Sequence, residues 1–173
     1  LLGQHPQWLA ENAQTAIELG SPGVDLNFGC PAKTVNKSKG GAVLLKETQT
    51  LYDIVKAVRD AVPAEIPVSA KIRLGFEDKS LAIENAIAIT EAGASELVVH
   101  ARTKTEGYKP PAYWDWIAKI KQHTDIPLVA NGEIWNAEDA QRCQSQSECT
   151  NLMIGRGALA MPNLAMSIKE GVA

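Results

Sequence analysis

The sequence predicts an α/β fold in which short parallel strands alternate with helices. Five runs rich in β-branched residues recur at intervals of roughly 25–45 residues, with amphipathic segments between them. No Gly-x-Gly-x-x-Gly follows the first run, which argues against a Rossmann fold, although a doubly wound sheet also fits the alternation. We predict part of a TIM (β/α)8 barrel, because the 173 residues carry five strands where a barrel has eight.

The predicted strands are short apolar runs, as expected of strands that are buried in a parallel sheet. Prolines precede two of them, at positions where a missing backbone N–H does no harm. Residues 1–3 could add a stub of a further strand. In order, the five predicted strands span 23–27, 68–74, 96–100, 127–130 and 151–154.

The predicted helices carry apolar residues three or four positions apart, which places those residues on one face. In the first helix Leu9, Ala13 and Ile17 share a face, and Gly20 follows where a helix can end. Gly93 ends the third helix in the same way, and Asn136 can cap the fourth. The four predicted helices span 8–19, 48–61, 80–92 and 136–143.

Residues 1–173 are predicted to be a fragment of a single catalytic barrel domain. A composition that is 45% hydrophobic and 21% charged is typical of globular proteins and excludes a disordered chain. No apolar run approaches the roughly 20 residues that a membrane span needs. Because missing strands would leave the sheet with open edges, we do not expect the segment to be stable alone.

Polar side chains interrupt three of the apolar strands near their carboxyl ends. Each of these strands carries two polar residues, which are spaced two positions apart and therefore point to the same side of the sheet. Solvated strand ends would explain one such pair, but the repetition on three strands indicates an active-site mouth, since barrel enzymes keep their chemistry at this edge. The pairs are Asp25 and Asn27, Lys71 and Arg73, and His100 and Arg102.

The ends of the last two strands suggest a phosphate site. Glycine allows the backbone to approach a phosphate closely, and an arginine can add a charge-assisted contact. A tight turn would also explain the glycine and arginine after the last strand, but the motifs at the two strand ends together favour a bound phosphorylated cofactor. The residues concerned are Asn131, Gly132 and Glu133 after one strand, and Gly155 and Arg156 after the other.

Cys30 follows the first strand between Gly29 and Pro31, which fix a sharp loop at the mouth of the predicted site. A cysteine thiol is mostly protonated at neutral pH, so Cys30 could act as an acid or, if activated, as a nucleophile; an inert buried cysteine is the alternative. Cys143 and Cys149 are read as structural. Their spacing fits no zinc pattern, so no metal is predicted. Three cysteines, an odd count, indicate reduced thiols in a cytosolic protein.

The stretch after Cys30 is locally basic, although 17 basic and 20 acidic residues give the whole chain a net charge of −3. That balance alone argues against a polyanionic partner. The basic stretch is either a solvated loop or a patch for the phosphates of a polynucleotide. The four tryptophans are read as packing residues. The lysines of the stretch are Lys33, Lys37, Lys39 and Lys46.

These motifs, in this order and spacing, resemble the tRNA-dihydrouridine synthase family, and within it the bacterial subfamily that modifies uridine 16. The resemblance covers nearly the whole chain. Its main motifs are Leu26-Asn27-Phe28-Gly29-Cys30-Pro31, Gly40-Gly41-Ala42, Lys71-Ile72-Arg73, Val99-His100-Ala101-Arg102-Thr103, Asn131-Gly132-Glu133-Ile134 and Met153-Ile154-Gly155-Arg156-Gly157-Ala158.

The resemblance implies an FMN-binding TIM barrel, followed by a helical domain, that reduces a uridine of tRNA to dihydrouridine in the cytoplasm. NADPH or NADH would reduce the flavin, the flavin would give a hydride to C6, and Cys30 would give a proton to C5. Residues implied to bind the cofactor are Lys71, His100, Asn131, Gly132, Glu133, Gly155 and Arg156. Residues implied to face the flipped-out uridine are Asn27, Arg73, Arg102 and Tyr108.

The chain departs from the family in ways that bear on these expectations. The N-terminal strands and the helical domain, which carries positive charge for tRNA, are absent, so the net charge does not count against tRNA. The segment alone is expected to be inactive, and Lys39 stands where glycine is common in the family. Oligomeric state cannot be read from the sequence, with a monomer as the default expectation.

Two alternatives to the tRNA reductase stay open at this point. One is an FMN barrel that acts on a free pyrimidine, as a dihydroorotate dehydrogenase does. The other is a truncated barrel that binds tRNA without catalysis.

Overall fold

Five parallel strands form one sheet in the order in which they occur in the sequence. The computed structural model describes residues 1–171. A doubly wound sheet reverses its strand order at a switch point, whereas the order here runs without reversal, as in a barrel. The prediction of a partial TIM barrel is confirmed. The strands are β1 (Val24–Asn27), β2 (Val68–Arg73), β3 (Glu96–His100), β4 (Leu128–Asn131) and β5 (Asn151–Met153).

The four predicted helices are present, with bounds that shift by a few residues. They are α1 (Pro6–Glu18), α3 (Thr48–Ala61), α4 (Ala82–Glu91) and α6 (Ala137–Ser147). The Asn136 side chain caps α6 as expected, by accepting a hydrogen bond from the backbone N–H of Asp139. Further helices were not predicted, and most of them are too short to show a helical period: α2 (Lys33–Lys37), the 3-10 helix η1 (Gly41–Lys46), α5 (Trp114–Lys121), α7 (Arg156–Ala160) and α8 (Leu164–Glu170).

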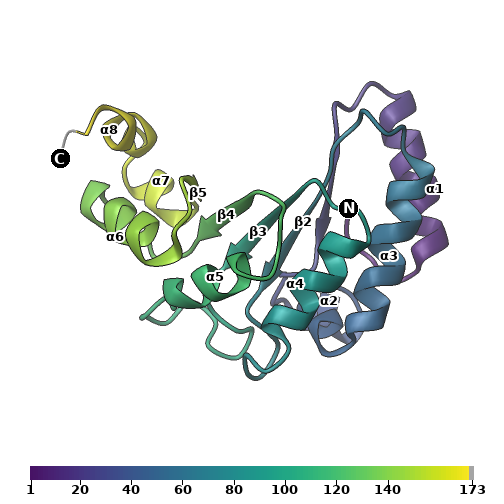
Figure 1. Cartoon of the computed structure of the whole chain (residues 1–173), viewed down its shortest axis with the longest axis horizontal. Coiled ribbons are helices and arrows are strands. Elements are labelled where there is room, and N and C mark those ends of the chain that lie inside the picture. The colour runs from purple at the N-terminus through teal and green to yellow at the C-terminus, as the bar shows by residue number, and fades with distance from the viewer. Residues whose placement is uncertain (172–173) are drawn as a thin grey trace.

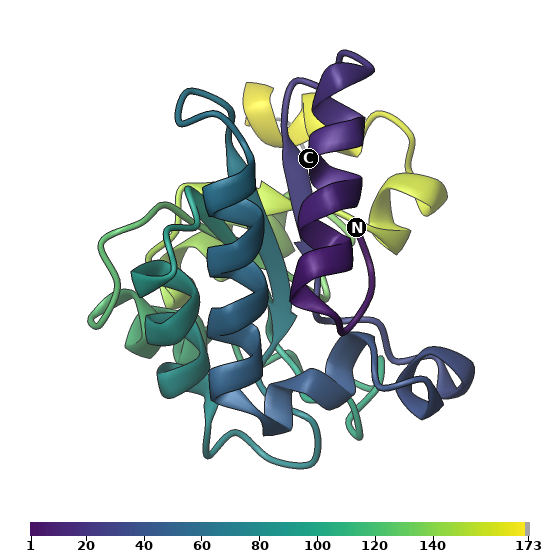
Figure 2. The same ribbon diagram turned by 90° about the vertical axis from the view of Figure 1, so that its right-hand side faces the viewer.

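Helices α3, α4, α5 and α6 lie side by side along one face of the sheet, and α1 packs beside α3 (Figures 1 and 2). Alternate strand residues face this helix layer and are almost fully buried, since side chains of a strand point to opposite faces in turn. Burial of this apolar face against the helices holds the fold together. The apolar strand residues on this face are Val24, Leu26, Val68, Ala70, Ile72, Leu97, Val99, Leu128 and Ala130.

The opposite face of the sheet is polar at its carboxyl end and would be the interior of a closed barrel. Asp25, Asn27, Ser69 and Lys71 are exposed or half-buried there. At the edge of the sheet, Leu1 exchanges backbone hydrogen bonds with Asp25 and Asn27. The predicted stub therefore flanks β1, although it is not long enough to be a strand. The five strands form an open arc whose inner face carries the site.

Residues 1–171 contain neither a candidate membrane span nor a candidate metal site. No helix among them has the length and apolar character to cross a membrane. They also hold no group of three or more histidine, cysteine and acidic side chains placed to bind a metal ion.

Candidate active site

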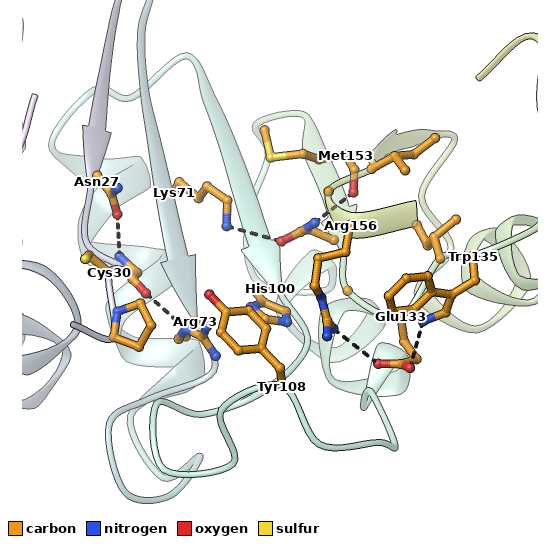
Figure 3. Close-up of a pocket in the computed structure, with 17 residues that line it drawn as sticks. Asn27, Cys30, Lys71, Arg73, His100, Tyr108, Glu133, Trp135, Met153 and Arg156 are labelled. Carbon is orange, nitrogen blue, oxygen red and sulfur yellow. Dashed lines mark hydrogen bonds and ion pairs between the residues drawn. The ribbon is translucent and has the colours of Figure 1, made fainter. Parts of the chain in front are cut away.

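A pocket of about 390 Å³ lies at the carboxyl ends of the strands, where the sequence predicted an active-site mouth (Figure 3). Its size is within the range of small-molecule and cofactor sites. Of the residues predicted to lie at the site, all but Asp25 and Arg102 line it. Four of the lining residues are basic or imidazole side chains and one is acidic, so the pocket favours an anionic ligand: Lys71, Arg73, His100, Arg156 and Glu133.

The loop after β1 holds Cys30 at one side of the pocket. The Asn27 side chain accepts a hydrogen bond from the backbone N–H of Gly29 (3.0 Å), which turns the chain at the end of the strand. The backbone carbonyl of Cys30 accepts two more, from Asn36 Nδ2 (2.9 Å) and from the N–H of Ala42 (3.0 Å). Gly41 has φ +67°, and a Cβ there would lie 2.8 Å from that same carbonyl oxygen. Cys30 is therefore fixed by its backbone.

Lys71 crosses the inner face of the sheet toward β4. Its Nζ donates to Asn131 Oδ1 at 3.2 Å, and Asn131 Nδ2 donates to the carbonyl of Met153 on β5 at 2.8 Å. Burial, together with the charge of Arg73, lowers the pKa of Lys71 to about 8, although Asp25 opposes the shift. The ammonium is thus largely charged at neutral pH and close to losing its proton.

Arg73 lines the pocket, but most of its guanidinium is occupied by backbone carbonyls. Its Nε donates to Gly29 (2.9 Å), and a terminal nitrogen donates to Thr103 (3.1 Å) and Gly107 (2.9 Å). These bonds tie the Cys30 loop to the loop after β3. Tyr108 of that second loop covers the guanidinium, with its ring centre 5.1 Å away.

His100, at the end of β3, is 5% exposed and packs against the backbone of Gly132. Gly132 has φ +118°, and a Cβ there would lie 2.7 Å from the imidazole Cδ2, so only glycine fits. Burial and the surrounding cations lower the pKa of His100 to about 3. The imidazole is therefore neutral throughout the physiological range.

Arg102 does not line the pocket, so it does not share the pocket-facing position of His100 that the spacing of the two residues predicted. Strand β3 ends at His100, so the alternation of side chains does not continue to Arg102. Its side chain is fully buried, donates to the carbonyl of Pro111 (3.1 Å) and pairs with Glu133. Arg102 lies behind the pocket wall.

Glu133 lines the pocket, but its carboxylate serves the residues around it. It pairs with Arg102, lies 3.8 Å from Arg156, and accepts a hydrogen bond from the indole N–H of Trp135 at 2.8 Å. Burial alone would raise the pKa of Glu133, but these hydrogen bonds and charges outweigh it and lower that pKa. A carboxylate held in this way positions arginines and does not itself attract a phosphate.

Sequence reasoning missed Trp135 as a site residue. Arg156 lies between two aromatic rings, 4.8 Å from the centre of Tyr108 and 4.9 Å from that of Trp135. The position of Trp135, two residues after Glu133 at a strand end, was the available signal. The interpretation of the tryptophans as packing residues holds for Trp114, which is buried. It does not hold for Trp135 or for Trp8, which is 63% exposed.

The basic stretch after Cys30 lies outside the pocket, and its lysines are exposed. Both interpretations of it, as a solvated loop or as a polynucleotide contact, stay open. Lys39 has φ +56°, in the left-handed region that glycine favours. Cys143 and Cys149 are buried free thiols, and burial raises the pKa of Cys143 to about 12, which agrees with their structural interpretation.

Comparison with known sequences identifies close relatives. The sequence model of the family described as Dihydrouridine synthase (Dus) matches residues 1–172. The tRNA-dihydrouridine(16) synthase of Shewanella oneidensis is 63% identical over 171 residues, which make up 99% of this chain and 54% of that protein. The proteins of the same name from Aquipseudomonas alcaligenes and Escherichia coli O157:H7 are 58% and 56% identical, over 96% and 98% of this chain and 53% of each relative. The chain thus spans about half the length of these relatives.

Comparison with solved structures supports the fold. The crystal structure of TcOYE with pHBA superimposes with a TM-score of 0.63 at 16% sequence identity, over 94% of this chain and 48% of that chain. At that identity the likeness concerns the fold alone, and it agrees with a partial barrel.

Proposed function

The chain belongs to the dihydrouridine synthase family, and from this premise we propose that the full-length protein reduces a uridine of tRNA to 5,6-dihydrouridine. The names of the relatives support position 16 as the target. The observation that carries the proposal is the placement of Cys30 beside a pocket lined by Lys71, Arg73, His100 and Arg156. A proton donor beside a cationic pocket suits the reduction of a ring with an anionic cofactor.

The residues present fit a phosphorylated flavin such as FMN. The pocket holds more positive than negative side chains, and the single carboxylate, Glu133, is already paired with arginines. A Cβ on Gly155 would meet nothing within 4 Å, so there is open space beside Arg156. Lys71 and His100 would contact the ring system, and Asn131, Gly132, Gly155 and Arg156 the phosphate end. Glu133 would act by holding Arg156.

When bound, a flavin that has been reduced by NADPH or NADH would supply the hydride for C6 of the uracil ring. Cys30 then provides the proton that C5 requires, so that the C5–C6 double bond gains one hydride and one proton. The thiolate that is left regains its proton from solvent. A thiol in this position can act as a general acid because it carries a transferable proton.

The other side chains hold and polarise the ring. The Lys71 ammonium, held by Asn131, stabilises negative charge that develops during the reaction. Asn27, Arg73 and Tyr108 lie on the Cys30 side of the pocket and would receive the uridine once it has left its stack. Because the substrate is tRNA, we propose a cytoplasmic location, and a monomer as the active form.

The proposal is tested with purified full-length protein, reduced cofactor and an unmodified tRNA transcript, with dihydrouridine measured by nucleoside mass spectrometry. We expect product with this transcript and none with a matched transcript that carries cytidine at position 16. Reduction or oxidation of a free orotate-type pyrimidine without any action on tRNA would overturn the proposal in favour of a free-pyrimidine enzyme. A colourless protein that binds tRNA with steep salt dependence and forms no product would instead indicate a binding module.

A further inference from the structure

The buried guanidinium of Arg102 contacts the imidazole of His100 behind the pocket wall. One terminal nitrogen of Arg102 lies 3.4 Å from His100 Nε2. The rest of the guanidinium is fixed, by the carbonyl of Pro111 at 3.1 Å and by the carboxylate of Glu133. A guanidinium has only donors, so His100 Nε2 must accept this hydrogen bond. The single proton of a neutral imidazole then resides on Nδ1.

The same edge of the imidazole is closed by the backbone at the end of β4. A Cβ on Gly132 would lie 2.7 Å from His100 Cδ2 and 3.1 Å from Nε2. The carbonyl of Gly132 accepts a hydrogen bond from Trp114 Nε1 at 2.9 Å, which holds this segment in place. The ring therefore has one packed edge, which carries Nε2, and an opposite edge that carries Nδ1.

His100 Nδ1 has no hydrogen-bond partner among residues 1–171, and the only buried side-chain atom in that range without a partner is Asn36 Oδ1. Nδ1 therefore keeps contact with solvent, and the solvent next to His100 is the pocket that it lines.

The charges around His100 keep the imidazole neutral. Lys71 and Arg73 of β2 face it from one side, Arg102 lies behind it, and Arg156 of α7 lies across the pocket. The Tyr108 ring lies beside the imidazole, tilted by 32° with the centres 5.9 Å apart. The one carboxylate that lines the pocket, that of Glu133, is neutralised by its pairing with arginines. No group here favours an imidazolium.

We propose that Arg102 is a positioning residue that sets the tautomer of His100, so that His100 presents a neutral Nδ1–H donor to the pocket. The ligand atom that His100 recognises is then a hydrogen-bond acceptor, such as a ring carbonyl oxygen or a ring nitrogen with a lone pair. His100 does not transfer a proton as an imidazolium would. This inference stands on the geometry of the chain and does not depend on the proposed function.

The tautomer can be read directly from the ¹⁵N chemical shifts of the imidazole. Full-length protein labelled with ¹⁵N-histidine is examined by long-range ¹H–¹⁵N correlation near pH 7, and the His100 signals are assigned by their loss in His100→Gln. We expect Nδ1 to be protonated and Nε2 to be unprotonated. A protonated Nε2 in the unaltered protein would overturn the proposal, and this result needs no Arg102 variant to fold.

The role of Arg102 is tested with Arg102→Met, which keeps a long side chain and removes every donor. We expect the Nε2–H tautomer to appear in a substantial fraction of the molecules, because Nε2 no longer has to accept. Arg142→Met is the matched control: Arg142 is exposed on α6, and its replacement should leave the His100 spectrum unchanged. If folded Arg102→Met retains the Nδ1–H tautomer in full, Arg102 does not set it.

Discussion

At the scale of single residues, the pKa of Lys71 is the property that can be measured most readily. Burial and Arg73 lower its pKa to about 8, so it loses its charge in an accessible pH range. If the ammonium helps to bind an anionic flavin, the affinity for FMN should be constant near pH 7 and fall above pH 8, by about tenfold per pH unit. Fluorescence quenching of FMN by full-length apoprotein, titrated from pH 7 to 9.5, measures this dependence.

The matched control for Lys71 is Lys71→Arg, because a guanidinium keeps its charge throughout this range. Its affinity for FMN, whatever the absolute value, should not change between pH 7 and 9.5. An equal decline in Lys71→Arg would assign the pH dependence to another group.

The sequence predicted which residues line the pocket better than it predicted what each of these residues does. Strand-end position identified most of the polar lining residues, because the carboxyl ends of parallel strands meet at one edge, whereas Tyr108 was expected only from the family resemblance. It did not predict that Arg102 turns away from the pocket, since this depends on where β3 ends. Nor did it predict that the Glu133 carboxylate pairs with arginines, because such pairing is tertiary. Trp135 was missed because the interpretation of all four tryptophans as packing residues did not use its position close to a strand end.

At the scale of elements, the turn after β4 depends on a glycine that no other residue can replace. Gly132→Ala is expected to displace His100, since the added methyl would lie 2.7 Å from its ring. We expect loss of FMN binding and a destabilisation of about 2 kcal/mol or more, from strain and overpacking together. Thermal unfolding and FMN titration of the full-length protein measure the two effects.

Gly107→Ala separates backbone strain from steric overlap. Gly107 also has a positive φ, +63°, but a Cβ there would meet nothing within 4 Å. We expect a cost of only about 1 kcal/mol, with FMN binding retained. Equal behaviour of the two variants would mean that contact with His100 is not what Gly132 provides.

In the loop after Cys30, Lys39 adopts a left-handed backbone conformation that lysine does not favour. Lys39 has φ +56°, so Lys39→Gly should remove strain and stabilise the protein by about 0.5–1 kcal/mol. Lys37 lies in α2, where glycine should destabilise by about 1 kcal/mol, which makes Lys37→Gly the opposite control. Thermal unfolding midpoints should move in opposite directions, and a lower midpoint for Lys39→Gly would contradict the interpretation.

The sequence predicted the long elements and missed most of the short ones for a physical reason. Helix α3 spans 14 residues, and its buried Leu51, Ile54, Val55 and Val58 repeat at a helical period that can be recognised. Helices α2 and α7 have five residues each and no such period. They form because the loops after β1 and β5 are held by tertiary contacts, such as the bonds from Asn36 and Ala42 to the Cys30 carbonyl.

At the scale of the whole molecule, the sheet divides the chain into two environments. One face is covered by helices (Figure 1) and supplies the stability. The other bears the polar strand ends and the pocket. The net charge of −3 is thus compatible with a cationic site, because the pocket is lined by Lys71, Arg73 and Arg156 but by a single carboxylate, that of Glu133. Charge distribution is more informative here than total charge.

The central claim is that this site reduces tRNA uridine with Cys30 as the acid. The most direct measurement is dihydrouridine in tRNA, by nucleoside mass spectrometry, from a host that lacks its own synthases and expresses the full-length protein. We predict that the unaltered protein and Cys143→Ala, which changes a buried thiol remote from the pocket, restore dihydrouridine, while Cys30→Ala reduces it at least a hundredfold. Restoration by Cys30→Ala would remove Cys30 from its role, and no dihydrouridine from a soluble, flavin-loaded unaltered protein would contradict the account.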